Sequence, residues 1–153
     1  QIHGGDTWNV VPEQVVMRGT VRTLDAGIQD RVEAAMKEVC AGVAQAHGAT
    51  IDLQYMRGYP GVINTPGETD AAAAAASRLV GEAQVMTDIK PAMGSEDFAF
   101  MLQKRPGAYI CIGAGETAND PQLHNPYYDF NDAILPLGAA YWVELVKQQL
   151  PAA

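Results

Sequence analysis

Cysteine and histidine are scarce in this chain, which has two cysteines and three histidines in 153 residues. Cys40 and Cys111 stand far apart in the sequence. Two unclustered cysteines provide neither a disulfide framework nor a thiolate zinc site. A reducing, cytoplasmic setting fits this cysteine usage best.

Positive charge is also sparse, because ten lysines and arginines stand among eighteen acidic residues, for a formal net charge of −8. Nucleic-acid-binding proteins neutralise phosphates with clustered lysine and arginine, so no nucleic-acid partner is expected. No apolar run approaches the roughly 20 residues of a membrane-spanning helix, so no membrane partner is expected either. The chain also lacks a serine nucleophile elbow, a GxGxxG motif and a Walker-type loop.

An initiator methionine and a basic, apolar leader are absent too, because the chain begins "QIHGGDTWNVVPE". Residues 1–3 have the pattern of a strand end that runs into a Gly-Gly turn. A chain that starts inside an element is expected to be a piece of a longer protein.

The first third of the chain has the pattern of a strand, a helix and a second strand. Residues 14–24 and 50–56 alternate apolar and polar side chains, which predicts two strands. Between them, apolar residues recur three and four apart, with Asp25 as the expected helix N-cap and Gly48 as the expected end. The pattern indicates part of an α+β layer.

A segment rich in proline and glycine, residues 57–68, is the best candidate for a domain boundary. The alanine-rich helix that follows is expected to pack closely on a sheet and to end at Gly81. Further along, Ser95 is expected to cap a short helix, and residues 108–113 predict a strand buried on both faces. A last helix is predicted from Pro136, so this block indicates an α/β layer.

His124 lies in the loop "LHNPYYDFND", which follows the predicted strand over residues 108–113. Ligands usually bind at the ends of strands in α/β sheets, and imidazole is a common metal ligand. One histidine does not make a metal site, however. The plain alternative is a loop histidine that only forms hydrogen bonds.

Four other side chains are candidates for binding, each with a plain alternative. Glu96 and Asp97 stand in the first turn of a predicted helix, where acidic residues are favoured by the helix dipole. Arg22 could clamp a carboxylate with its bidentate guanidinium, or could lie on a solvated sheet face. Asn9 could bind a ligand, or could serve only the turn that precedes the strand.

Four motifs occur in an order that resembles a known family: "GGDTWNVVPEQVVMRGTVRTLD", "YPGVIN", "MGSEDFAFMLQKRPGAYICIG" and "LHNPYYDFNDAILPLGAAYW". The chain resembles the metal-dependent amidohydrolases and peptidases of the aminoacylase and carboxypeptidase G type, above all the branch of hippurate hydrolase and indole-acetyl-amino-acid hydrolase. The resemblance covers nearly the whole chain.

The resemblance implies a zinc-peptidase-like α/β catalytic domain interrupted by a ferredoxin-like α+β lid that also mediates dimerisation. Residues 1–58 would be part of the lid, and residues 59–153 the C-terminal part of the catalytic domain. The linker at 57–68 agrees with that division. A homodimer through the lid is therefore expected.

Site residues follow from the resemblance, position by position. His124 matches a metal ligand, Asn9 and Arg22 match lid residues that bind the carboxylate end of the substrate, and Glu96 matches a segment at the border of the active-site pocket. The full enzyme would hold two divalent metal ions, which could be zinc, manganese, cobalt or nickel, and this chain would hold at most one partial site. The general base and the other ligands match no residue here, so no catalytic residue is assigned.

The expected function is that of the C-terminal part of a metallo-amidohydrolase that cleaves the amide bond of hippurate-like N-acyl or N-aroyl amino acids or of small peptides. The chain alone is expected to be inactive. A different class remains open, namely a catalytically inactive module that dimerises or binds a small carboxylate.

Overall fold

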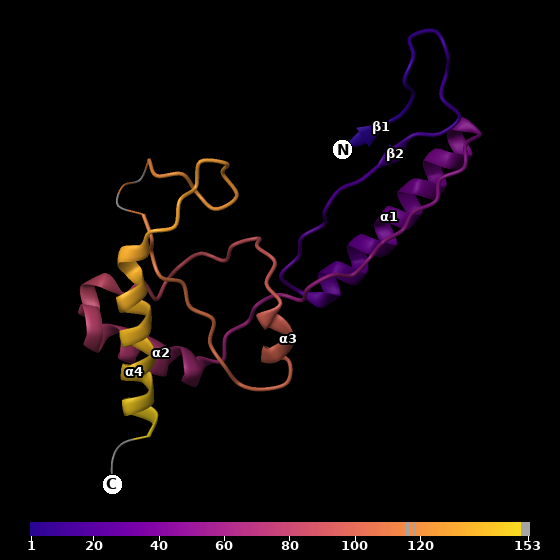
Figure 1. Cartoon of the computed structure of the whole chain (residues 1–153). Coiled ribbons are helices and arrows are strands. Elements are labelled where there is room, and N and C mark those ends of the chain that lie inside the picture. Colours follow the sequence, from indigo (N-terminus) through magenta and orange to yellow (C-terminus); the bar gives the residue numbers. More distant parts are fainter. Residues whose placement is uncertain (116, 118, 151–153) are drawn as a thin grey trace. The chain divides into compact units, whose positions relative to one another are not determined.

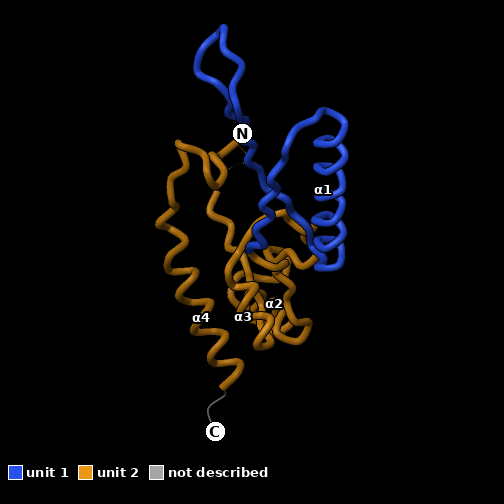
Figure 2. The backbone as a smooth tube through the Cα atoms, turned by 90° about the vertical axis from the view of Figure 1, so that its right-hand side faces the viewer, with its two compact units in different colours: residues 1–58 blue, residues 59–153 orange. Residues whose placement is uncertain are grey.

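The computed structural model describes residues 1–115, 117 and 119–150 (Figure 1). The last three residues of the expected catalytic part therefore lie outside the described residues. The chain divides into two compact units, Gln1–Gly58 and Tyr59–Ala153 (Figure 2). Their assignment to a lid domain and a catalytic domain stays a prediction.

Helix α1 (Ala26–His47) is the main element of the first unit. Its first turn is capped by Asp25, whose Oδ1 accepts a hydrogen bond from the amide of Ile28 at 2.8 Å. It ends at Gly48, which has a left-handed φ of 61° and donates its amide to the carbonyl of Ala44. Both predicted helix signals, the cap at Asp25 and the end at Gly48, are confirmed. Each of them acts on backbone groups within one helical turn.

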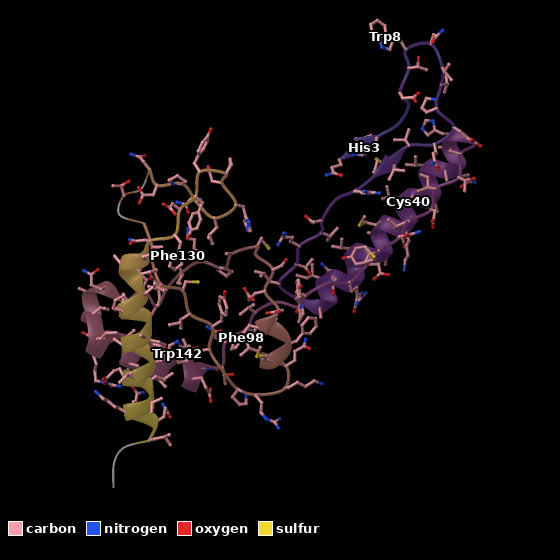
Figure 3. The ribbon with its side chains drawn as sticks, in the orientation of Figure 1. His3, Trp8, Cys40, Phe98, Phe130 and Trp142 are labelled. Carbon is pink, nitrogen blue, oxygen red and sulfur yellow. The ribbon has the colours of Figure 1, made fainter. Side chains whose placement is uncertain are left out.

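Strand pairing in the first unit is much shorter than predicted. Strand β1 (Ile2–His3) pairs antiparallel with strand β2 (Val16–Met17), and the loop between them carries the fully exposed Trp8 (Figure 3). The strands predicted over residues 14–24 and 50–56 are otherwise wrong, since neither range forms a longer strand. A strand is defined by a backbone partner, and segment 1–3 is long enough to pair with only a few residues.

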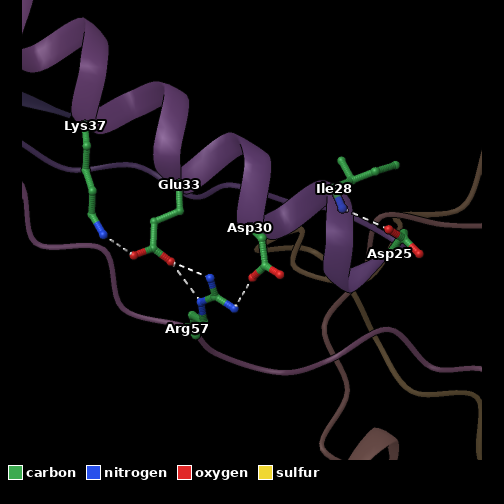
Figure 4. Close-up of polar contacts among 6 residues, drawn as sticks. All are labelled: Asp25, Ile28, Asp30, Glu33, Lys37 and Arg57. Carbon is green, nitrogen blue, oxygen red and sulfur yellow. Dashed lines mark hydrogen bonds and ion pairs between the residues drawn. The ribbon is translucent and has the colours of Figure 1, made fainter.

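The segment after α1 is attached to that helix by charged side chains (Figure 4). The guanidinium of Arg57 contacts a carboxylate oxygen of Glu33 at 2.7 Å and one of Asp30 at 2.6 Å. Lys37 adds a contact of 2.6 Å to Glu33. Hydrogen bonds from Lys37 and then Arg57 hold the pKa of the Glu33 carboxyl below its ordinary value. The linker thus begins at a residue bound to α1.

The second unit is built on two helices that pack against each other. Its helices, including two short 3-10 turns, are α2 (Pro66–Val80), η1 (Glu82–Gln84), α3 (Phe98–Leu102), η2 (Asp132–Ile134) and α4 (Leu135–Gln149). Ala72 and Ala75 of α2 bury themselves against Tyr141 of α4. The alanines give the close packing that was expected, but their partner is a helix and not a sheet. An ion pair of 2.7 Å between Arg78 and Glu144 joins the same two helices.

Two predictions about the middle of this unit are wrong. Helix α3 takes Asp97, not Ser95, as its N-cap. Residues 108–113 form no strand and are not buried, with Ile110 39% exposed. Within them, the backbone of Tyr109 is bonded by the side chain of Asn64. Just before them, the amide of Thr65 donates to the carbonyl of Gly107 at 2.9 Å. The mixed helix and strand content is as expected, while the ferredoxin-like detail stays a prediction.

Within the described part of the chain, no helix combines the length and the apolar character needed to cross a bilayer.

One glycine inside α1 and one at its C-terminal end make a matched test of this architecture. Gly48→Ala is expected to lower the free energy of unfolding by roughly 1–2 kcal/mol, because its φ of 61° brings a Cβ against the backbone. Gly42→Ala, inside α1 and with open space around it, should raise that free energy by about 0.5–1 kcal/mol. Urea unfolding followed by helical circular dichroism checks both. Changes of the same sign would contradict the assigned helix end.

Candidate functional site

His124 occupies the third position of a tight turn. The amide of Asn125 donates to the carbonyl of Gln122 at 3.0 Å, and His124 has a φ of 70°. Among the residues that the structure describes, it is the single non-glycine with a positive φ. Such a backbone costs on the order of 1–3 kcal/mol and tends to occur at functional sites, although histidine enters this region more readily than most residues.

Hydrogen bonds from the following residues hold the turn. The side-chain oxygen of Asn125 accepts the amide of Tyr127 at 2.9 Å, and its carbonyl accepts the amide of Tyr128 at 2.9 Å. Further along, Asn131 donates to the carbonyl of Ala114 at 3.0 Å and so joins the two ends of the loop. The position of His124 is therefore set by local contacts.

The imidazole of His124 is exposed, which leaves it accessible to a ligand. In the described ranges, no three histidine, cysteine, aspartate or glutamate side chains come together in a way that could hold a metal ion. What this turn presents is a single nitrogen donor of the type that zinc, manganese, cobalt or nickel accepts. Its role as a metal ligand stays a prediction.

A pocket of about 470 Å³ lies in the same loop region. Its wall is largely apolar and aromatic, and includes Leu123, Tyr127, Tyr128 and Phe130. Its volume falls in the range of roughly 300–1,000 Å³ that is usual for small-molecule sites. The loop that positions His124 therefore also forms a cavity.

Glu96 precedes helix α3 and is bonded to the segment that was predicted as a buried strand. One oxygen of its carboxylate accepts the hydroxyl of Tyr109 at 2.9 Å, and the other accepts the amide of Asp97 at 3.1 Å. The hydrogen bond from Tyr109 is the main reason why the pKa of the Glu96 carboxyl is lowered. The same bond raises the pKa of the Tyr109 hydroxyl. Glu96 is therefore ionised at neutral pH and fixes Tyr109.

Asn9 and Arg22 belong to the other unit. Asn9 lies in the exposed loop beside Trp8, and Arg22 lies exposed on the segment between β2 and α1. Both are accessible to a ligand. Their expected roles in binding a carboxylate, like the place of Glu96 at a pocket border, stay predictions.

Sequence reasoning missed Asn64. Its side-chain amide donates to the carbonyl of Tyr109 at 2.9 Å and accepts the amide of the same residue at 2.8 Å. An asparagine side chain thus replaces a neighbouring strand for this residue. The two residues are 45 positions apart, so no spacing in the sequence could have indicated the pair.

Comparison with known proteins decides the family. Residues 4–148 match the peptidase family M20/M25/M40. The chain belongs to this family. N-acetylcysteine deacetylase of Bacillus subtilis is 32% identical to it, and the match covers 95% of this chain and 37% of that protein. Hippurate hydrolase of Campylobacter jejuni is 31% identical, with 97% of this chain and 38% of that protein covered.

A solved structure agrees with the M20 assignment. The YXEP protein of Bacillus subtilis, a dinuclear metal-binding peptidase of the M20 family, superposes with a TM-score of 0.78 at 29% identity. The superposition covers 100% of this chain and 41% of that one. The chain thus spans about two-fifths of the length of these M20 relatives.

Replacement of His124 by glycine tests the strain in the turn. His124→Gly is expected to raise the free energy of unfolding by roughly 0.5–1 kcal/mol, because relief of the left-handed backbone exceeds the added freedom of the unfolded chain. His124→Ala keeps the Cβ and should give no gain. Urea unfolding of the two variants checks this, and equal stabilities would argue against a strained residue 124.

The hydroxyl of Tyr109 is the subject of a second prediction. Tyr109→Phe should move the pKa of the Glu96 carboxyl up toward its ordinary value, because that hydroxyl is its main hydrogen-bond donor. A lowered carboxyl pKa stabilises the folded state above the ordinary pKa, and the contribution is lost as the pH falls through the folded-state value. The wild type should therefore be more stable than Tyr109→Phe near neutral pH and lose that advantage in acid.

Carboxyl-carbon NMR and urea unfolding across the acid range measure these two effects. Tyr59→Phe is the matched control, because the Tyr59 ring packs edge-on against Phe100, and the hydrogen bond to Glu96 comes from Tyr109. A Glu96 pKa that responded equally to both substitutions would contradict the assignment.

Proposed function

We propose that this chain forms part of a metallo-amidohydrolase of the M20 family that cleaves the amide bond of N-acyl or N-aroyl amino acids, such as hippurate, or of small peptides. The observation that carries the proposal is the strained turn at His124. A chain of this family holds an exposed imidazole in an unfavourable backbone conformation, next to a pocket of small-molecule size. Strain of that kind is retained where the position of a side chain matters.

The names of two relatives support the class of substrate. Hippurate and N-acetylcysteine are both amino acids that carry an acyl group on the nitrogen, and the relatives named for them are 31% and 32% identical to this chain. The shared chemistry is an amide carbonyl two bonds away from the carbon that carries a carboxylate. An N-acyl amino acid is therefore the proposed substrate.

The residues of this chain have distinct parts in the proposal. His124 would hold one divalent metal ion through a ring nitrogen, and a bound metal of this kind polarises the amide carbonyl and lowers the pKa of a water molecule. Asn9 and Arg22 would bind the substrate carboxylate, which suits an amide and a guanidinium. Glu96 would lie at the border of the active-site pocket of the whole enzyme, where it accepts the hydroxyl of Tyr109.

The site that this chain supplies is a partial one. The whole enzyme would use two metal ions, as the name of the solved relative suggests, with zinc, manganese, cobalt or nickel as candidates. His124 contributes one donor, and the remaining donors would lie outside the described residues. The chain alone is therefore proposed to be inactive.

The first unit would act as part of a lid and as a dimerisation surface. The two-stranded sheet of β1 and β2 leaves backbone groups unpaired along its edges, and such edges pair readily with another chain. A homodimer formed at this edge is the proposed assembly, and the cytoplasm is the proposed location. Dimerisation without any metal binding would favour the alternative, an inactive binding module.

Manganese binding tests the proposal on the chain as it is. Paramagnetic Mn²⁺ should broaden the amide signals of residues 122–131 in isotope-labelled protein, because the ion binds at His124. His124→Asn should abolish that broadening, since asparagine tolerates a left-handed backbone but lacks the imidazole. His47→Asn, at the end of α1, is the matched control and should leave it intact.

The same samples serve for an activity assay. Hippurate incubated with the chain and added metal should stay intact, because one donor does not assemble a catalytic site. Broadening that survives in His124→Asn, or turnover by the 153-residue chain, would overturn the corresponding part of the proposal.

A further inference from the structure

The pocket in the His124 loop has a wall of aromatic and aliphatic side chains. Three aromatic rings that line it, Tyr127, Tyr128 and Phe130, follow His124 within six residues. Ile112 and Ile134 contribute aliphatic surface from the two ends of the loop. A cavity with aromatic and aliphatic walls favours a flat apolar group over a charged one.

The charged groups at the pocket also favour an uncharged ligand group. Among the described residues that line the pocket, two carry a carboxylate, Asp120 and Asp129, and none carries a basic group. Asp120 accepts the hydroxyl of Thr117 at 2.6 Å and its amide at 3.0 Å, which occupies both oxygens. A second carboxylate brought close to Asp129 would be repelled. The carboxylate end of a substrate is therefore excluded here, while an uncharged acyl group is not.

Tyr127 is the ring best placed for a ligand. The residue is 83% exposed even though it lines the pocket, so contact with a ligand would remove apolar surface from water. The bond from its amide to Asn125 fixes its backbone. Tyr127 stands three positions after His124, which limits the distance between their Cα atoms to about 11 Å. His124 does not itself line the pocket, but its neighbours Gln122 and Leu123 do, so a ligand in the pocket would lie beside the His124 turn.

We propose that this pocket receives the acyl group of the substrate, that it prefers an aromatic acyl group to acetyl, and that the ring of Tyr127 provides the preference. The inference rests on the proposed function, because the metal at His124 would hold the amide carbonyl from which the acyl group extends. Tyr127 is thus a specificity-determining residue, and the carboxylate end of the substrate lies away from this pocket.

Two ligands that differ only in the acyl group test the proposal. Hippurate and N-acetylglycine share the glycine carboxylate, and each is titrated into isotope-labelled chain with saturating Zn²⁺. Hippurate is expected to shift the amides of residues 123 and 127–134 and to bind roughly threefold to tenfold more tightly than N-acetylglycine, the factor expected from one aromatic contact. Tyr127→Ala should remove most of that difference, and Tyr127→Phe should keep it.

Trp142→Ala is the matched control, since it removes an exposed ring on α4 that does not line the pocket. Equal affinities for the two ligands, shifts confined to other residues, or an unchanged preference in Tyr127→Ala would each overturn the proposal. Amide spectra show whether each variant is folded. Failure of the proposed function gives a different result, because Mn²⁺ broadening at residues 122–131 would then be absent while the response to hippurate could still be read.

Discussion

The backbone of His124 is held in the left-handed region by hydrogen bonds on both sides of it, and the candidate site depends on that constraint. The turn is closed by a hydrogen bond of 3.0 Å from the amide of Asn125 to the carbonyl of Gln122. Asn125 then accepts the amides of Tyr127 and Tyr128. These bonds offset the cost of the positive φ. Without them the loop would relax, and the imidazole and the aromatic rings after it would no longer have fixed relative positions.

The helix ends were predictable because their signals are local. Asp25 bonds to an amide three residues away, Gly48 and Gly81 both have positive φ, and α4 has a proline in its first turn as expected. Strands require a second segment whose position the sequence does not reveal. The alternation in residues 50–56 predicted a strand, yet this segment forms none, and the residue after it, Arg57, is ion-paired to α1. An alternation of apolar and polar residues indicates that the two faces of a strand would differ, but it does not indicate which segment pairs with that strand.

At the candidate site, too, local features were easier to predict than contacts between distant segments. His124 was a candidate from its place after an apolar run and from the family resemblance, and its role as a metal ligand stays a prediction. Its positive φ could not be read from the residue type. Tyr109 had no functional prediction, because its contacts with Glu96 and Asn64 join segments 13 and 45 residues apart. Signals within one helix turn, such as Asp25 and Gly48, were confirmed, although Ser95 was not the N-cap of α3. Predictions that needed a distant partner segment were wrong, as for residues 50–56 and 108–113, or could not be made, as for Tyr109.

In the second unit, asparagine side chains form hydrogen bonds that hold irregular segments in a defined conformation. Asn64 pairs with both backbone groups of Tyr109, and Asn131 donates to the carbonyl of Ala114 while accepting the amide of Ala133. An amide side chain carries a donor and an acceptor, so it can take the place of a missing peptide neighbour. The loop around His124 is therefore held in a defined conformation by side-chain hydrogen bonds, although no strand pairs with it. That order leaves the faces of Tyr127 and Phe130 exposed, and an exposed, positioned aromatic surface is a suitable contact for an acyl group.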